Sequence, residues 1–291
     1  MKTILLGPGG QLGTDIRRAN EAAGSVLDIV PVGRDRLDLA DFDRVRELLS
    51  TADFDVLVNC SSYHKTDEVE GNAQQAFAIN AHLVALLAEL AQAKSARFVH
   101  VSTDYVFGGQ DKREPLGEGD ARAPVNVYGA SKAMGEDLAR LACENTLILR
   151  VASLFGVAGA SGKGGNFVET MIRFGRERGH LRVVADQHMS PTSTQDIAAA
   201  LLTMLRDEVP AGIWHVVNSG GTTWHGFAEE IIRRSGTKAS VEAIPSSEFP
   251  TPARRPAYSV LSNDKLAAAI GAPRPWQDAL DAYLAEKGYL A

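Results

Sequence analysis

The sequence predicts an α/β protein built on a doubly wound parallel sheet of the Rossmann type. Short aliphatic and β-branched runs alternate with helical patterns through the first half of the 291 residues, which is typical of βαβ units. A glycine-rich turn at residues 7–13 directly follows the first of these runs. Apolar residues make up 45% of the chain and charged residues 23%, which excludes disordered, collagen-like and coiled-coil proteins.

Five strands and four helices are expected in the first half of the chain. Parallel strands need right-handed crossovers, so these units should wind onto one sheet with helices on both faces. The strands are expected at residues 3–6, 25–32, 56–59, 97–102 and 146–151, and the helices at residues 11–23, 41–50, 73–93 and 128–142.

A second, smaller lobe is expected after Arg150, where the pattern changes to glycine-rich loops. This C-terminal substrate-binding lobe is expected to be discontinuous in sequence. Helices are predicted at residues 167–178, 195–206 and 223–234, the last with Thr222 or Thr223 as N-cap, and strands at residues 181–184 and 214–217. The Rossmann domain is assigned residues 1–152 and 192–212, and the second lobe residues 153–191 and 213–291.

Charge and cysteine content limit the partners and the cellular location. The net charge of −6 provides no field that would attract nucleic acid. Cys60 and Cys143 are too few for a disulfide framework and have no metal-ligand spacing, so a reducing compartment and no metal are expected. The N-terminus does not resemble a signal peptide, and a late apolar stretch at residues 197–205 is too short to span a bilayer. A cytoplasmic protein with no membrane partner is therefore expected.

The glycine-rich turn indicates a dinucleotide site. Gly7, Gly10 and Gly13 allow a tight turn and a close approach of the backbone to a pyrophosphate, while Gln11 and Leu12 open the following helix. The alternative is a tight strand-to-helix loop with no ligand. The position of the motif at the first βα turn favours nucleotide binding.

Arg34 indicates which nucleotide is bound. It follows the second strand, where proteins specific for NAD usually carry an acid for the ribose 2′-hydroxyl. A guanidinium can instead pair with a 2′-phosphate, so NADPH is predicted, with NADH as the second choice. Asp38 and Leu39 are expected at the adenine. The alternative for Arg34 is a solvated loop charge.

A candidate catalytic group combines a helix with the end of a strand. Tyr128 and Lys132 are four residues apart, so they project from one face of a helix, where an ammonium would stabilise a phenolate. Such pairs also occur as solvated surface pairs. Thr103 lies at the predicted carboxyl end of a strand, where open α/β sheets bind ligands, and can donate to a carbonyl oxygen that Tyr128 protonates. The alternative is that Thr103 and Asp104 form a turn that closes the strand.

These residues together resemble the extended short-chain dehydrogenases/reductases, and more narrowly the dTDP-4-dehydrorhamnose reductase family. The resemblance implies that Thr103, Tyr128 and Lys132 are catalytic and that the loop Asn59-Cys60-Ser61-Ser62 lines the cofactor. It also implies reduction of the 4-keto group of a nucleotide-linked 6-deoxyhexulose. The other matching motifs are Tyr63 with Asp67 and Glu70, Asn80, residues 101–108, residues 124–129, Ser131, Asn166-Phe167, Asp186-Gln187, residues 190–192, and Arg255-Pro256 with Ser259.

Departures from the family pattern cluster on the side expected to face the sugar. His64 and Thr66 replace a Thr and a Val, Ser153 replaces a Trp, and Met189 replaces a Gly. Either the loops have drifted neutrally or the substrate differs, because an indole face is lost and an imidazole is gained. The residues expected to contact substrate are His64, Thr66, Asp104, Tyr105, Ser153, Asn166 and Arg255.

Three functions remain open on the sequence. The first is reduction of a nucleotide-activated keto sugar. The second is another extended short-chain reaction, epimerisation or dehydration; Tyr105 follows Asp104 where a dehydratase normally has a second carboxylate, which disfavours dehydration. The third is a regulatory subunit that binds NADP without catalysis. A nucleotide sugar is the expected partner, and a homodimer is left open.

Overall fold

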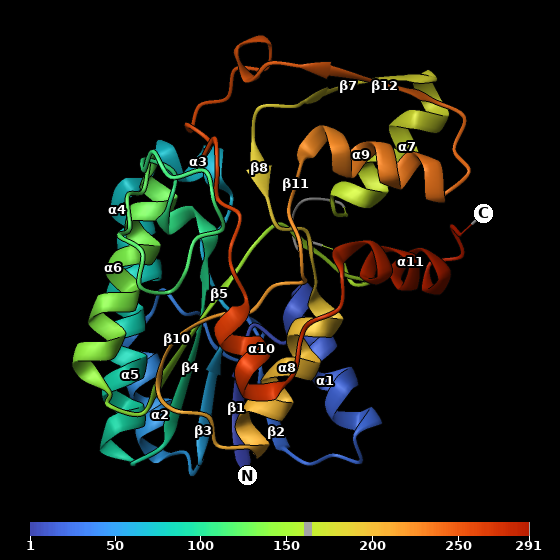
Figure 1. Ribbon diagram of the computed structural model, residues 1–291. Helices are drawn as coiled ribbons and strands as arrows, with labels where there is room; N and C mark the ends of the chain where they lie inside the picture. The colour runs from blue at the N-terminus through green and yellow to red at the C-terminus, as the bar shows by residue number, and fades with distance from the viewer. Residues whose placement is uncertain (160–164, 291) are drawn as a thin grey trace.

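The computed structural model describes residues 1–159 and 165–290, and its centre is a six-stranded sheet (Figure 1). The strand order is β10-β5-β4-β3-β1-β2, and every neighbouring pair is parallel. The predicted doubly wound parallel sheet is confirmed. Because the order reverses at β1 and β3, the loops after these two strands diverge and leave a binding crevice between them. The strands are β1 (Lys2–Leu6), β2 (Asp28–Val32), β3 (Val56–Asn59), β4 (Arg97–Thr103), β5 (Thr146–Val151) and β10 (Gly212–His215).

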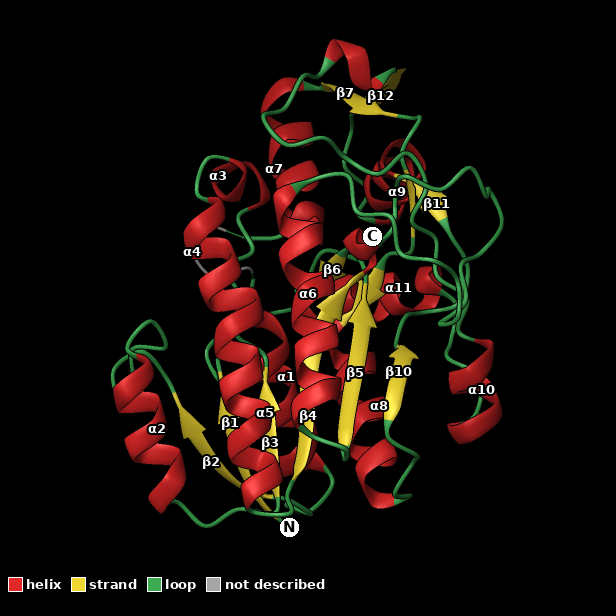
Figure 2. Cartoon of the chain, turned by 90° about the vertical axis from the view of Figure 1, so that its left-hand side faces the viewer, coloured by secondary structure: helices red, strands yellow, loops and turns green. Residues whose placement is uncertain are grey.

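Helices cover both faces of this sheet (Figure 2). One face packs its apolar side chains against α2 (Phe42–Thr51), α5 (Leu83–Ala93) and α6 (Val127–Ala142). The other face packs against α1 (Gln11–Ala22) and α8 (Thr194–Arg206). The central strands β1, β3, β4 and β5 are mostly buried, as expected for a parallel sheet that is covered on both sides, although several polar side chains are buried with them.

The helix expected at residues 73–93 contains a π-helical turn. It consists of α4 (Ala73–Phe77), the turn η1 (Ala78–His82) and α5. By length and composition this 21-residue stretch, with a mean hydropathy of 1.4, could cross a membrane. However, α5 packs against the sheet and α6, so the structure accounts for its apolar character as core packing.

The second lobe lies above the carboxyl ends of the strands (Figure 1). Its core joins α7 (Phe167–Arg178), α9 (Trp224–Arg234) and α11 (Trp276–Glu286). Thr223, one of the two candidates, is the N-cap of α9 and accepts from the Gly226 N–H at 3.0 Å. The expected boundary after residue 212 falls inside β10, which pairs with β5 in the main sheet.

Several short elements were not expected from the sequence. The pair β7 (His180–Val184) and β12 (Ser240–Ile244) is parallel, but only β7 was anticipated. The remaining elements are α3 (Thr66–Glu70), η2 (Asp104–Val106), β6 (Leu154–Phe155), β8 (His188–Met189), β9 (Thr192–Ser193), β11 (Thr222–Thr223), η3 (Ser246–Glu248) and α10 (Asp264–Ile270).

Candidate functional site

The glycine-rich turn has the geometry of a phosphate cradle. Gly7 has a positive φ of 76°, and a Cβ at Gly13 would lie only 2.2 Å from the Gly7 carbonyl oxygen. Gly10 is the N-cap of α1 and has no side chain to cover the first N–H groups of the helix. The turn therefore directs unblocked backbone donors and the positive end of the helix toward the crevice.

The turn packs against the loop after β3, and the two segments leave polar atoms without partners. A Cβ at Gly7 would lie 3.2 Å from Ser61 Oγ. Ser61 Oγ and Gln11 Oε1 are buried and make no hydrogen bond to the described residues. Buried polar groups are usually paired, so these two atoms fit a ligand that supplies the partners. The Ser61 hydroxyl and the free N–H groups of the turn can donate to the pyrophosphate of a dinucleotide, whereas Gln11 Oε1 needs a donor from another part of the ligand. Leu12, in contrast, is buried in the core between α1 and the sheet.

Arg34 lies in a turn beside the glycine loop. A Cβ at Gly33 would be 3.8 Å from Pro8 Cγ, so the two turns are adjacent. Arg34 is exposed and has no ion-pair partner in the described part of the chain. Asp38 accepts from the Ala40 N–H at 3.0 Å, and Leu39 packs against the core. Arg34 is thus exposed beside the glycine loop, and its contact with a 2′-phosphate stays a prediction, as do the adenine contacts.

Three hydroxyl groups from three separate elements meet at the end of the sheet. The Tyr128 hydroxyl on α6 interacts with the side chains of Thr103 at the end of β4 and Ser62 after β3. Thr103 also donates to Asp104 Oδ1 at 3.0 Å and accepts from the Tyr105 N–H at 3.1 Å. The structure thus brings together two of the three predicted catalytic residues, and the turn foreseen as an alternative for Thr103 is formed as well.

Lys132 is turned away from Tyr128. Its Nζ donates to the Val101 carbonyl at 2.6 Å and lies 3.0 Å from His100 Nε2. Burial lowers the pKa of Lys132 to about 7 and raises the pKa of Tyr128 well above its usual value of 10. Burial therefore disfavours the expected ammonium in this arrangement, in which Lys132 contacts β4, and stabilisation of a phenolate by Lys132 stays a prediction.

Close backbone contacts hold α6 in place. The Asn126 side chain caps the helix by accepting from the Gly129 N–H at 2.8 Å. A Cβ at Gly129 would lie 2.1 Å from the Tyr105 carbonyl oxygen, and a Cβ at Gly135 would lie 2.1 Å from that of Asn80. Only glycine allows these approaches, and they set the rotation and the height of the helix against its neighbours.

Asn80 in the π-helical turn connects α6 to the loop that follows β3. Its amide accepts from the Tyr63 N–H at 2.9 Å and donates to the Tyr63 carbonyl and to Ser131 Oγ, each at 3.1 Å. π-helical turns often occur at functional sites, and here the turn positions a residue between two parts of the site.

Residues predicted to contact the sugar form a group next to Tyr128. The Tyr105 and Tyr128 rings meet edge to face with centroids 5.8 Å apart. Burial raises the pKa of Asp104 to about 6, although Ser259 and Thr103 donate hydrogen bonds to it. Arg255 contacts Tyr105 and binds Asp67 at 2.7 Å.

The segment with the altered residues borders the hydroxyl cluster. His64 Nδ1 lies 3.4 Å from the Ser62 carbonyl oxygen, and Thr66 Oγ1 contacts the His64 carbonyl at 3.5 Å. Ser153, between β5 and β6, has a positive φ of 44°, in the region that favours glycine. His64 is two residues from Ser62, which interacts with Tyr128, and its contact with the substrate stays a prediction.

Two of the residues placed on the sugar side by the sequence make contacts within the second lobe. Asn166 caps α7 by accepting from the Glu169 N–H at 3.1 Å and donates to the Gly156 carbonyl and to Tyr283 Oη, each at 3.0 Å. Its amide is therefore used within the second lobe. Met189 is buried in the same core. For these two positions, the sequence pattern reflects packing.

A polar cavity of about 370 Å³ opens beside Arg255, between the loop after η2 and the loop after β12. Arg113, Arg254 and Arg255 line it together with Gln187 and Phe249. Guanidinium groups bind phosphate oxygens well, and an aromatic side chain offers a face for a base, so this cavity suits an anionic nucleotide.

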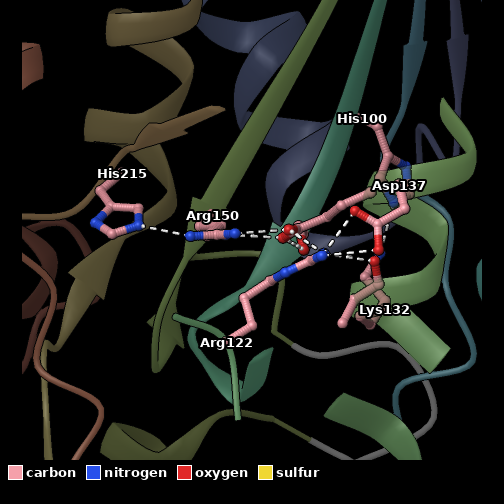
Figure 3. Close-up of polar contacts among 9 residues, drawn as sticks. His100, Arg122, Lys132, Asp137, Arg150 and His215 are labelled. Carbon is pink, nitrogen blue, oxygen red and sulfur yellow. Dashed lines mark hydrogen bonds and ion pairs between the residues drawn. The ribbon is translucent and has the colours of Figure 1, made fainter. Parts of the chain in front are cut away.

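A buried ionic network next to the site was not foreseen from the sequence (Figure 3). Glu136 Oε1 accepts from Arg150 Nε at 2.9 Å and from Ser102 Oγ at 2.5 Å, and Glu136 Oε2 accepts from Arg150 Nη2 at 2.7 Å and Arg122 Nη1 at 3.2 Å. Arg150 Nη1 lies 3.3 Å from His215 Nε2. Burial and the nearby Arg150 lower the pKa of His215 to about 3. Two features of the sequence could have indicated this network: Arg150 stands in an otherwise apolar strand, and Glu136 follows Lys132 by one helical turn.

Comparison with known proteins agrees with this geometry. The sequence matches the family described as the RmlD substrate binding domain over residues 1–288. The spore coat polysaccharide biosynthesis protein SpsK of Bacillus subtilis (strain 168) is 35% identical over 286 residues, 98% of each chain. A dTDP-4-dehydrorhamnose reductase of Burkholderia thailandensis is 36% identical over 297 residues, covering 96% of this chain and 97% of that protein. The crystal structure of dTDP-4-dehydrorhamnose reductase from Bacillus anthracis str. Ames in complex with NADP is 32% identical with a TM-score of 0.90, covering 98% and 99% of the two chains.

Proposed function

This chain belongs to the RmlD substrate-binding-domain family, and from that premise we propose that it reduces the keto group of a dTDP-linked deoxysugar with NADPH. The chain is an oxidoreductase with a Rossmann fold. The observation that carries the proposal is the meeting of the Thr103, Ser62 and Tyr128 hydroxyls at the carboxyl end of the sheet.

The chain's own residues provide the acid and its orientation. A bound NADPH would supply the hydride for the keto carbon. Tyr128 donates its hydroxyl proton to the keto oxygen, and Thr103 and Ser62 hold that hydroxyl in place. Burial keeps Tyr128 protonated in the pH range of the cell, which suits a proton donor.

The nucleotide groups are assigned to two separate regions. The backbone around Gly7, Gly10 and Gly13 and the unpaired Ser61 and Gln11 atoms support the dinucleotide site, with Arg34 at the 2′-phosphate. The cavity lined by Arg254 and Arg255 supports a site for the nucleoside diphosphate of the sugar.

The alternatives are less well supported by the site. Dehydration has no second carboxylate beside Asp104 to assist it, because Tyr105 occupies that position. A purely regulatory role leaves the buried group of Thr103, Ser62 and Tyr128 without a purpose. Which deoxysugar is used, whether two chains associate, and the cytoplasmic location stay predictions. The changes at His64 and Ser153 reflect either neutral drift of the loops or a hexose that differs from the 6-deoxy-4-hexulose of the family, and turnover of that hexulose by the unmodified protein distinguishes the two.

Replacing the acid tests the proposed reaction. Tyr128→Phe removes only the proton donor, so turnover of a dTDP-linked 4-keto-6-deoxyhexose should fall by ~10²–10⁴-fold, since general acid catalysis typically contributes this factor. NADPH binding, followed by its fluorescence, should be unchanged. Tyr289→Phe, near the C-terminus, is the matched control and should keep full activity. Turnover within twofold of the unmodified protein in Tyr128→Phe would refute the assignment.

A further inference from the structure

His100 on β4 lies between an amide and the catalytic lysine. Its Nδ1 is 3.2 Å from Asn59 Nδ2, and its Nε2 is 3.0 Å from Lys132 Nζ. All three side chains are buried, so each contact has to match a donor with an acceptor within the protein (Figure 3 shows the positions of His100 and Lys132).

The orientation of the Asn59 amide is determined by the loop that follows it. The Ser61 backbone N–H donates to Asn59 Oδ1 at 3.0 Å. If the Asn59 amide were flipped, its NH₂ group would face the Ser61 N–H, and two donors cannot form a hydrogen bond. The NH₂ group of Asn59 therefore faces His100 and donates to Nδ1, which must carry a lone pair. A neutral imidazole has a single N–H, so in His100 that hydrogen is on Nε2.

This tautomer determines which form of Lys132 can pair with His100. The His100 Nε2–H points at Lys132 Nζ, and only an uncharged amine has a lone pair to accept it. The amine then donates one of its own N–H groups to the Val101 carbonyl at 2.6 Å. An ammonium in the same position would place donors against each other at His100.

Burial lowers the pKa of Lys132 more than the nearby acidic groups raise it. Glu136, one helical turn away, uses both carboxylate oxygens on Arg150, Arg122 and Ser102. The Cys60 thiol also faces Lys132, and burial raises its pKa to about 12, so it is uncharged. Tyr128 on the same helix is protonated. No carboxylate of the described residues forms a hydrogen bond with Lys132 Nζ.

We propose that His100 is a positioning residue that holds Lys132 as a neutral amine, and that Lys132 takes up a proton when it leaves His100 and turns toward Tyr128. The role of Lys132 in catalysis rests on the proposed function, but its charge rests on the hydrogen-bond geometry alone. Because Tyr128 and Lys132 share one face of α6, the rotation needs no movement of the helix. The pKa of Lys132, lowered by burial to about 7, agrees with this state.

Nuclear magnetic resonance of the protein alone tests the first half of the proposal. Lysine labelled with ¹³C and ¹⁵N and histidine labelled with ¹⁵N report both charges, and the signals are assigned with Lys132→Met and His100→Gln. We expect an uncharged Lys132 at about pH 8.5, with its midpoint near 7, and the Nε2–H tautomer of His100 at that pH. An ammonium at Lys132 or a hydrogen on His100 Nδ1 would overturn the proposal. His82→Gln, on the exposed side of η1, is the control and should leave both signals unchanged.

A single substitution should reverse the tautomer. In Asn59→Asp, the carboxylate can accept from both the Ser61 N–H and His100 Nδ1, which frees His100 Nε2 to accept from an ammonium. We expect the Lys132 midpoint to rise by more than about one pH unit in the same measurement. An unchanged midpoint in the folded variant would show that His100 does not set the charge of Lys132. If the variant does not fold, the measurement on the unmodified protein still decides the question.

Proton uptake tests the second half of the proposal. Addition of NADP⁺ at about pH 8.5, where a phosphate is fully ionised, should bring uptake of about one proton per chain, measured by calorimetry in buffers of different ionisation enthalpy. Lys132→Met should abolish this uptake. If the unmodified protein takes up no proton, the proposed rotation of Lys132 toward Tyr128 is wrong. None of these readouts uses the keto sugar, so failure of the proposed function would leave them unaffected.

Discussion

Arg150 and Lys132 are both buried to within 1% of full burial, and both lie between the sheet and α6, yet their surroundings differ. Arg150 forms two hydrogen bonds to the Glu136 carboxylate. Lys132 contacts a backbone carbonyl and a neutral imidazole. A charge that has to stay buried is matched by an opposite charge, whereas a group that gains and loses a proton is placed among neutral partners. Burial alone therefore does not show whether a basic side chain keeps its charge; the groups that it contacts do.

Removing the carboxylate from Arg150 should have the largest effect. Glu136→Gln keeps the shape of the side chain but leaves Arg150 buried without a counter-charge, and breaking a buried pair in this way typically costs ~3–5 kcal/mol. We expect the free energy of unfolding, measured by urea denaturation, to fall by this amount. A loss under about 1 kcal/mol would mean that Arg150 does not depend on its partner.

Lys132 should respond to pH in the opposite way to a paired cation. The folded chain loses the Lys132 proton near pH 7 and the unfolded chain near pH 10.5, so the unfolded chain binds more protons between these values. Stability should therefore rise with pH in this window, by up to about 1.4 kcal/mol per unit from this group. Lys132→Met should remove this contribution, seen as a smaller slope of unfolding free energy between about pH 7 and 9. Equal slopes in the two proteins would show that Lys132 is charged in the folded chain.

Arg34 extends the comparison to a cation that is exposed and unpaired. If its partner is the 2′-phosphate, Arg34→Ala should weaken NADPH binding roughly tenfold and leave NADH binding unchanged, as expected for one charge-assisted contact at the surface. Fluorescence titration with both nucleotides measures the ratio. Arg36→Ala, two residues along the same turn, serves as the control. An equal loss of both nucleotides would place Arg34 away from the 2′ position.

The smallest effect is expected at the exposed end of the buried network. Asp137 binds Arg122 through both oxygens at 2.7 Å, but half of its side chain is exposed. Asp137→Asn should therefore lower the unfolding free energy by only ~0.2–1 kcal/mol, as surface ion pairs typically do. A loss as large as that of Glu136→Gln would mean that the network acts as one unit.

The sequence allowed the sheet and its covering helices to be predicted, because apolar runs and helical periods report local structure. Other elements depend on distant contacts. The π-helical turn at Ala78–His82 forms where Asn80 meets α6, which no local pattern indicates. Strand β12 is mostly exposed and so lacks an apolar run. Both became visible only with the tertiary packing.

In the candidate site too, some residues could be predicted from local sequence and others depend on distant contacts. Spacing identified Tyr128 and Thr103, because helix and strand geometry alone bring such residues to a ligand-binding edge. The sequence did not show that Met189 packs in the core of the second lobe or that Asn166 caps a helix there. His100 and Glu136 escaped notice altogether. Their importance comes from partners 32 and 14 residues away in sequence, and only the folded chain shows these contacts.

The glycines of α6 also limit how this protein can be engineered. A side chain at Gly129 or Gly135 would overlap a carbonyl oxygen of a neighbouring segment. The helix is therefore fixed at two points along its length by contacts that leave no room for an added atom. Libraries that aim to change the substrate should leave this helix untouched and vary the loops around it. The acid then keeps its position, and selectivity can be altered separately from reactivity.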